Sequence, residues 1–266
     1  MKKSIFNRKK LTFHRNRVSK NWFKNAYIKY EASKRLNERI IELDKNFEMV
    51  LDIGSHSGEL SKILNNNSKI KKIIQSELSI KLAKNAKKIN SSIINCDEEN
   101  LPFKPNVFNA VISSMSLHWV NNFNNLLKNI NNILKSDGLI LANFLGGETL
   151  NELRKVLISA ETEILGGTSL RVSPFVDIKS VGSLLQSAGF NMPVVDSDKI
   201  IVTHKSIINL LKDLRYMAEN SSLNYKVIPL RRDVLKRADE IYKNKFFTFN
   251  KRIVSSFDLI TMIAWK

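Results

Sequence analysis

The chain has 266 residues, of which 43% are hydrophobic and 26% charged, a balance typical of one globular α/β domain with extra elements. No apolar stretch of about 18 residues occurs, which argues against a membrane-spanning helix. The single cysteine, Cys96, excludes an internal disulfide and a cysteine-based metal cluster, so we expect a cytoplasmic enzyme without a metal site.

The net charge of +18 has two competing explanations. It either marks a nucleic acid or other anionic partner, or it reflects a compositional bias that enriches the surface in lysine and asparagine. Residues 1–24 contain no acid and nine bases, namely Lys2, Lys3, Arg8, Lys9, Lys10, Arg15, Arg17, Lys20 and Lys24. This segment lacks the apolar core and cleavage site of a secretory signal, so we interpret it as a retained arm.

An amphipathic helix is predicted next, over residues 20–43, from apolar residues at helical spacing. These are Trp22, Phe23, Ile28, Leu36, Ile40 and Leu43. We therefore divide the chain into a basic N-terminal arm and helix at 1–45 and a cofactor-binding domain at 46–266.

Short apolar runs then alternate with helical stretches, a pattern typical of a doubly wound sheet. The expected strands are 49–53, 70–74, 92–96, 107–113 and 139–144, and the expected helices are 60–64, 78–89 and 123–134. Helices are also expected at 148–163, 177–188, 207–218 and 227–242, with β structure at 194–202 and 257–265. We predict an α/β fold with a seven-stranded, mostly parallel sheet, an N-terminal helical arm and helical lid insertions.

The lid is expected to span residues 147–180, whose glycine-rich loops would let it close over a substrate. Arg154, Glu161 and Arg171 flank these loops. Each of them either faces the substrate or forms a surface salt bridge.

Three acidic residues lie at the ends of successive predicted strands, where an open parallel sheet binds its ligands. Asp52 lies in the sequence VLDIGSHSG, Glu77 follows the second strand and Asp97 the third. A carboxylate in the place of Glu77 suits two ribose hydroxyls, and Asp97 suits an adenine amino group. Gly54 and Gly58 permit close approach of the backbone to a ligand. These residues favour an adenosyl ligand with a cationic head, such as S-adenosylmethionine.

Two histidines belong to the same predicted edge of the sheet. His56 stands where this fold usually has glycine, and its ring would crowd the methionine part of the cofactor, although histidine tolerates positive φ. His118 follows the fourth strand and is either a general base, a substrate partner or a packing residue beside Trp119.

Several motifs resemble the mitochondrial and bacterial assembly factor of respiratory complex I, a methyltransferase-fold family described as protein-arginine hydroxylases. The likeness runs nearly end to end and includes IFNR at 5–8, SLHWV at 116–120, GGETL at 146–150, SPF at 173–175 and IAWK at 263–266. Asn7 and His56 depart from the family pattern, which has Asp and Gly there. The resemblance implies a class I S-adenosylmethionine-dependent methyltransferase fold and modification of a complex I subunit at an arginine.

Other functions stay open at this point. A more distant resemblance, to the malonyl-acyl-carrier-protein O-methyltransferase of biotin synthesis, implies an acyl carrier protein as partner, which would meet the basic arm. A non-catalytic assembly module with a degenerate cofactor site is a third hypothesis. An RNA methyltransferase, favoured only by charge, is a fourth.

Overall fold

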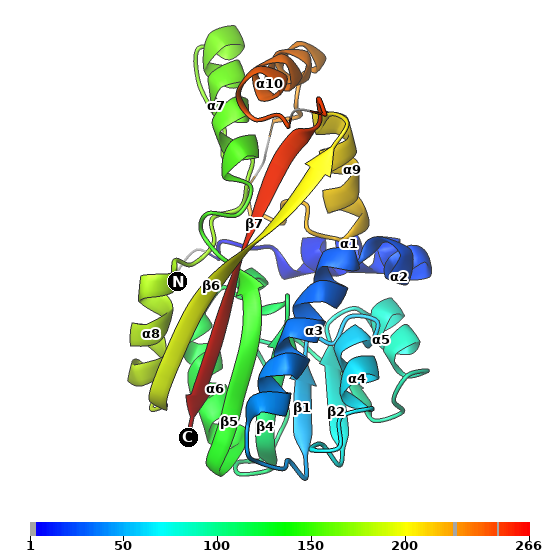
Figure 1. Cartoon of the computed structure of the whole chain (residues 1–266), viewed down its shortest axis with the longest axis vertical. Coiled ribbons are helices and arrows are strands. Elements are labelled where there is room, and N and C mark those ends of the chain that lie inside the picture. Colours follow the sequence, from blue (N-terminus) through cyan, green and yellow to red (C-terminus); the bar gives the residue numbers. More distant parts are fainter. Residues whose placement is uncertain (1–3, 226–227, 249) are drawn as a thin grey trace.

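The computed structural model describes residues 4–225, 228–248 and 250–266 (Figure 1). Within these residues seven strands form one sheet in the order β3-β2-β1-β4-β5-β7-β6. They are β1 (Val50–Ile53), β2 (Ile73–Glu77), β3 (Ile93–Asn95), β4 (Phe108–Ser114), β5 (Leu134–Leu145), β6 (Asn191–His204) and β7 (Ile253–Trp265). β1 to β5 are parallel, and β7 runs antiparallel to both β5 and β6. The predicted doubly wound, mostly parallel sheet is confirmed.

Helices connect the strands, and several begin where a side-chain oxygen accepts a hydrogen bond from the first turn. Asn7, Ser79 and Asp177 cap α1, α5 and α8 in this way. The helices are α1 (Arg8–Val18), α2 (Trp22–Asn25), α3 (Tyr27–Glu42), α4 (Glu59–Leu64), α5 (Ile80–Ala86), α6 (Phe123–Ile133), α7 (Asn151–Leu165), α8 (Ile178–Ser187), α9 (Ile207–Tyr216) and α10 (Arg232–Lys245), with 3-10 turns η1 (Ser19–Asn21) and η2 (Leu117–Trp119). None of these helices is long and apolar enough to cross a membrane.

The structure corrects some predicted boundaries. The helix expected over 20–43 is broken at Ala26, whose ψ of +36° is not helical, so α2 and α3 are separate. The last strand begins at Ile253 rather than at 257, and the helix expected from 227 begins at Arg232. Lys2, Lys3 and the expected start of that helix at Val227 lie outside the described residues.

Two hydrophobic layers cover the two faces of the parallel strands. On one face, α3 and α4 pack against Val50, Ile73 and Ile112. On the other, α6 and α8 pack against Leu51 and Val111. Neighbouring strand residues point to opposite faces, and because both faces are buried, the strands are continuous apolar runs.

Above this layered part, β6 and β7 extend as a long antiparallel pair past the other strands, together with α7, α9 and α10 (Figure 1). A further hydrophobic cluster joins these three helices to β7. The arm formed by α1 and α2 lies across the carboxyl ends of the parallel strands, below α9 (Figure 1). The edge of the sheet at which we expect ligands is therefore covered by the N-terminal arm.

Candidate cofactor and substrate site

A tight loop after β1 contains the two glycines that we assigned to cofactor contact. Gly54 has φ +66° and Gly58 has φ +90°, conformations that glycine adopts without strain. A Cβ atom on Gly54 would collide with the side chain of Ser116. Gly58 immediately precedes α4. The loop therefore requires glycine at both positions, and its backbone at Gly54 lies close to the side chain of Ser116.

Asp52 lies at the base of this loop and is completely buried. Its Oδ2 accepts a hydrogen bond of 2.9 Å from Ser61, while its Oδ1 and the hydroxyl of Ser55 have no partner among the described residues. Burial raises the pKa of Asp52 to about 7. Since unsatisfied buried polar atoms cost about 1–3 kcal/mol each, two of them in one loop fit a polar ligand at this place.

Glu77 is the last residue of β2 rather than a residue that follows the strand, and its carboxylate contacts the N-terminal arm. Nη1 of Arg15 lies 3.1 and 3.3 Å from its two carboxylate oxygens, and the backbone amide of His56 donates to Oε2 at 3.0 Å. Arg15 also donates to Glu98 at 2.9 Å and to Ser116 at 2.8 Å. The guanidinium of Arg15 thus occupies the place that we assigned to ribose hydroxyls.

Asp97 follows β3 as expected, and it is held by a second arginine of the same arm. Nε and Nη2 of Arg8 lie 3.1 and 2.6 Å from its two carboxylate oxygens. Arg8 also forms an ion pair with Glu98. Burial alone would raise the pKa of Glu98, but Arg8 and Arg15 outweigh this effect and lower it to about 2. Glu98 is therefore ionised, and both Asp97 and Glu98 are held by Arg8 of α1.

His56 fills the centre of the glycine loop. Its φ is +49°, and its ring stacks on Trp22 with 5.1 Å between ring centroids. Burial lowers its pKa well below the usual value, as do the charges of Lys29 and Arg15, so the ring is neutral. That the ring of His56 crowds the methionine part of the cofactor stays a prediction.

The space between the predicted cofactor residues is closed in this structure. A recess is lined by Asp52, Gly54, Ser55 and His56, together with side chains of α3 and α4. It leaves no room for a water molecule. Arg15 of α1 and Trp22 of α2 cover it. The chemistry of the site fits an adenosyl ligand, but entry of such a ligand requires the arm to move.

His118 lies in η2, directly after β4, and is buried. Its Nε2 lies 2.9 Å from the carboxylate of Glu219, and its Nδ1 accepts from the amide of Leu145 at 3.4 Å. The Nε2 atom therefore carries the proton and donates it to Glu219. Burial lowers the pKa of His118 although Glu219 opposes this effect. The ring also packs near Trp119, which fits the packing role, while its roles as general base or substrate partner remain predictions.

Glu219 is a central residue that the sequence analysis missed. It accepts hydrogen bonds from His118 and Trp119 and forms an ion pair with Lys29. Burial would raise its pKa, but Lys29 and His118 lower it to about 2. The only sequence signal was a polar run, ENSS at 219–222, directly after an amphipathic helix.

Glu219 also lines a cavity of about 150 Å³ between the sheet and the helices α7 and α9. The hydroxyls of Ser173 and Ser221, which line it as well, are buried without a partner among the described residues. Most of the wall is apolar and consists of Leu145, Leu150, Leu153, Leu157, Val172, Phe175, Leu211, Leu214, Leu230 and Phe257. An apolar cavity with a few convergent polar groups is typical of a substrate site.

Arg154, Glu161 and Arg171 make contacts within the segment 147–180, where we expect the lid. Arg171 forms an ion pair with Glu161, which is completely buried, so the salt bridge that we placed at the surface is largely internal. Arg154 donates to the carbonyl oxygen of Gly147 at 3.2 Å. Of the three, Arg171 lines the cavity.

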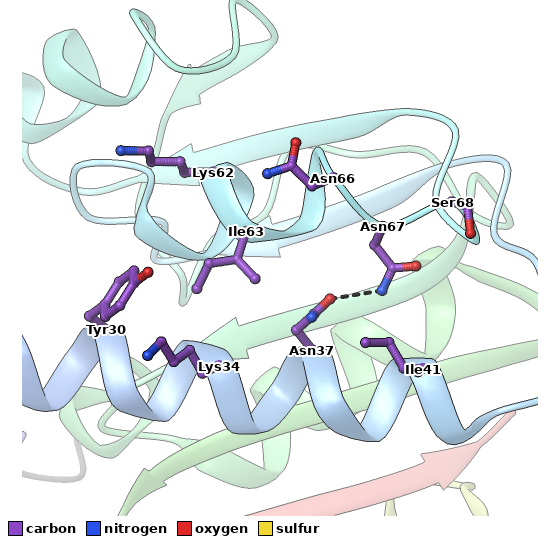
Figure 2. Close-up of a pocket in the computed structure, with 9 residues that line it drawn as sticks. All are labelled: Tyr30, Lys34, Asn37, Ile41, Lys62, Ile63, Asn66, Asn67 and Ser68. Carbon is purple, nitrogen blue, oxygen red and sulfur yellow. Dashed lines mark hydrogen bonds between the residues drawn. The ribbon is translucent and has the colours of Figure 1, made fainter.

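A separate open groove of about 460 Å³ lies between α3 and α4 (Figure 2). Asn67 donates to Asn37 across it at 2.8 Å, and Lys34 and Lys62 lie along its walls (Figure 2). None of the residues predicted to bind cofactor or substrate lines this groove. Lys34 and Lys62 are therefore suitable positions for control variants.

The amino-acid sequence of the chain is similar to those of known proteins. A family model described as a methyltransferase domain matches residues 51–142, from β1 into β5. The human protein named arginine-hydroxylase NDUFAF5, mitochondrial, is 36% identical over 260 residues, which cover 94% of this chain and 75% of that protein. The chain belongs to the NDUFAF5 family. The resemblance inferred from the sequence motifs is thereby confirmed.

More distant relatives of the NDUFAF5 family match as well. A malonyl-[acyl-carrier protein] O-methyltransferase of Methylovorus is 24% identical, over 91% of this chain and 83% of that protein. A SAM-dependent methyltransferase of Thermotoga maritima has a similar structure, with a TM-score of 0.54 and 17% identity, covering 96% of this chain and 98% of the other. The structural likeness confirms the methyltransferase fold.

Proposed function

We propose that this chain is an S-adenosylmethionine-binding enzyme that modifies an arginine side chain of a protein, as a step in the assembly of respiratory complex I. Membership of the NDUFAF5 family supports this, since the human relative is named an arginine hydroxylase. The observation that carries the proposal is the position of Glu219, an ionised buried carboxylate in the wall of a mostly apolar cavity. Such a cavity suits a cationic side chain with an apolar stem.

The cofactor residues of the proposal are Asp52, Gly54, His56, Gly58, Glu77 and Asp97, all of which lie at or just after the carboxyl ends of β1, β2 and β3. Glu77 would accept from the ribose and Asp97 from the adenine. When bound, the cofactor would supply a methyl group on a cationic sulfonium. The name of the Thermotoga structure, a SAM-dependent methyltransferase, supports the same cofactor.

Cofactor binding has a structural condition in this proposal. Arg15 contacts both carboxylate oxygens of Glu77, so a ribose and Arg15 compete for the same carboxylate. We infer that α1 withdraws when the cofactor enters. The same contact also favours the competing hypothesis of a non-catalytic assembly module. In that case Arg15 would stay on Glu77 and keep the cofactor site permanently closed.

Calorimetric titration with S-adenosylmethionine separates the two hypotheses. The native chain should bind weakly, and Arg15→Gln, which removes the competing charge, should bind about tenfold more tightly or better. His56→Gly tests whether the imidazole obstructs the loop. If native protein and both variants fail to bind while remaining folded, the cofactor assignment is wrong and the assembly module is favoured.

The reaction is tested with acceptor substrates. An arginine-containing peptide incubated with the protein and S-adenosylmethionine should gain a methyl group on arginine. The same peptide supplied with O2 and a two-electron reductant should instead gain one oxygen atom, the other leaving as water, and mass spectrometry distinguishes the two products. Methylation of a malonyl thioester on acyl carrier protein would instead support the function named for the Methylovorus relative. Methylation of RNA would support the fourth hypothesis. We also propose that the protein is located in the cytoplasm, as expected from the sequence. The human relative is named as mitochondrial.

A further inference from the structure

A basic groove lies on the outer side of the N-terminal arm, away from Glu77. It has a volume of about 890 Å³ and lies between η1 and α2 on one side and the end of α9 on the other. Its lining residues are Arg17, Val18, Lys20, Asn21, Lys24, Asn25, Lys212, Arg215 and Tyr216. All five charged side chains in this list are cationic.

The five cations have no acidic partner among the residues that the structure describes. The ion pairs found there involve none of them. Arg17 instead donates to the backbone carbonyl of Arg215 at 3.3 Å and to the side chain of Asn220 at 3.2 Å. Asp213, the acid of α9, pairs with His204 instead. Like charges gathered in one groove repel each other, and an anion bound among them would relieve that repulsion.

The cations that line the groove lie on two short segments, 17–24 of the arm and 212–215 of α9. On α3, which follows α2, Arg35 and Arg39 pair with acids of β6 and add no free charge. A polyanion such as RNA is bound best by a cationic track that follows many phosphates. A compact cluster of five cations in one groove matches a short run of carboxylates better.

Exposed aromatic side chains accompany the cations: Tyr216 lines the groove, Arg17 lies over the ring of Phe13, and Phe23 and Tyr27 flank Lys24 in the sequence. Phe13, Phe23, Tyr27 and Tyr216 are between 43% and 63% exposed. Arginine and aromatic residues are the types enriched in protein interfaces, where the rings pack on apolar side chains of the partner. The combination is suited to a polypeptide that carries acidic and apolar residues together.

We propose that this groove is a docking site for an acidic segment of a partner protein, whose Asp and Glu side chains pair with Arg17, Arg215 and the neighbouring lysines. The site lies beside the apolar cavity, because α9 separates the two. Leu211 and Leu214 on its inner side line the cavity, and Asn220, which accepts from Arg17, lines the cavity as well. The proposal does not depend on which reaction occurs in that cavity.

The test uses a fluorescein-labelled peptide of ten glutamates, with a ten-residue glutamine peptide as the neutral probe. The variant Lys212→Gln/Arg215→Gln removes two groove charges whose side chains make no hydrogen bond in the described structure. The matched control, Lys34→Gln/Lys62→Gln, removes two charges from the groove of Figure 2. Melting curves verify that both variants fold.

The native chain should bind the glutamate peptide and not the glutamine peptide, measured by fluorescence anisotropy. The groove variant should weaken binding by about tenfold, and the control by less than about twofold. An equal loss in both variants would mean that only the net charge matters, and would overturn the proposal. It would also be overturned if a labelled single-stranded RNA bound more tightly than the peptide with the same sensitivity to the groove variant.

Discussion

Arg15 joins two carboxylates that would otherwise repel each other, because its Nη1 lies 3.1 Å from Oε1 of Glu77 and 2.9 Å from Oε1 of Glu98. All three side chains are at most 2% exposed. The interaction connects residues far apart in the sequence. It fixes α1 on the carboxyl ends of β2 and β3.

Removal of Arg15 should therefore destabilise the fold. Arg15→Met leaves two buried carboxylates without their shared cation, and we expect the free energy of unfolding to fall by about 3–5 kcal/mol in urea titrations at neutral pH. Arg15→Met combined with Glu77→Gln should recover part of the loss, because one charge is then absent. A single variant as stable as the native chain would mean that the arm contributes little to folding.

Glu77 should also control cofactor affinity if it accepts from the ribose. Glu77→Gln keeps the shape of the side chain and removes its charge, so S-adenosylmethionine binding should weaken by about 1.5–3 kcal/mol in calorimetry. Asp97→Asn is the matched control, and its effect should be smaller because its side chain is 26% exposed. Unchanged affinity in Glu77→Gln would contradict the ribose assignment.

His118 should affect turnover rather than cofactor binding. If it transfers a proton, His118→Ala should lower turnover on the arginine peptide by about a hundredfold or more and leave cofactor affinity unchanged. Trp119→Phe removes the other neutral donor to Glu219 and keeps an aromatic ring, so it should retain most activity. Equal losses in the two variants would assign His118 a packing role.

Asp52 gives a prediction about pH. Its pKa is about 7 in the folded chain because of burial, against 3.8 ordinarily, so the folded state binds more protons than the unfolded state between these values. Its favourable contribution is thus complete below about pH 4 and lost as the pH rises through 7. The free energy of unfolding of Asp52→Asn minus that of the native chain should therefore be larger at pH 8 than at pH 5. Urea unfolding of both proteins at the two pH values measures this difference. An identical difference at the two pH values would contradict the raised pKa.

The sequence predicted the sheet well because its signals are local. Apolar runs of strand length, alternating with helical spacing, placed Asp52, Glu77 and Asp97 at neighbouring strand ends, and parallel pairing then brings those ends to one edge. Gly54 and Gly58 marked the loop between β1 and α4. Such features require only a few consecutive residues to be recognised.

Other parts of the site could not be predicted because they depend on contacts between distant segments. Nothing near Arg15 in the sequence indicates that it pairs with Glu77, and Glu219 lies 101 positions from His118. The break at Ala26 was also missed, because alanine is a strong helix former and neither glycine nor proline stands there. Basic residues in the arm were recognised, but not that some face inward and others outward.

That last division has a thermodynamic consequence. Arg15 and Arg17 belong to one short helix, the first paired with the cofactor carboxylates and the second lining the basic groove. A movement that releases Arg15 from Glu77 also displaces Arg17 from α9. If α1 withdraws as proposed, occupancy of the groove and occupancy of the cofactor site are linked equilibria, and whatever factor the groove ligand imposes on cofactor affinity, the cofactor would impose in return on the groove ligand.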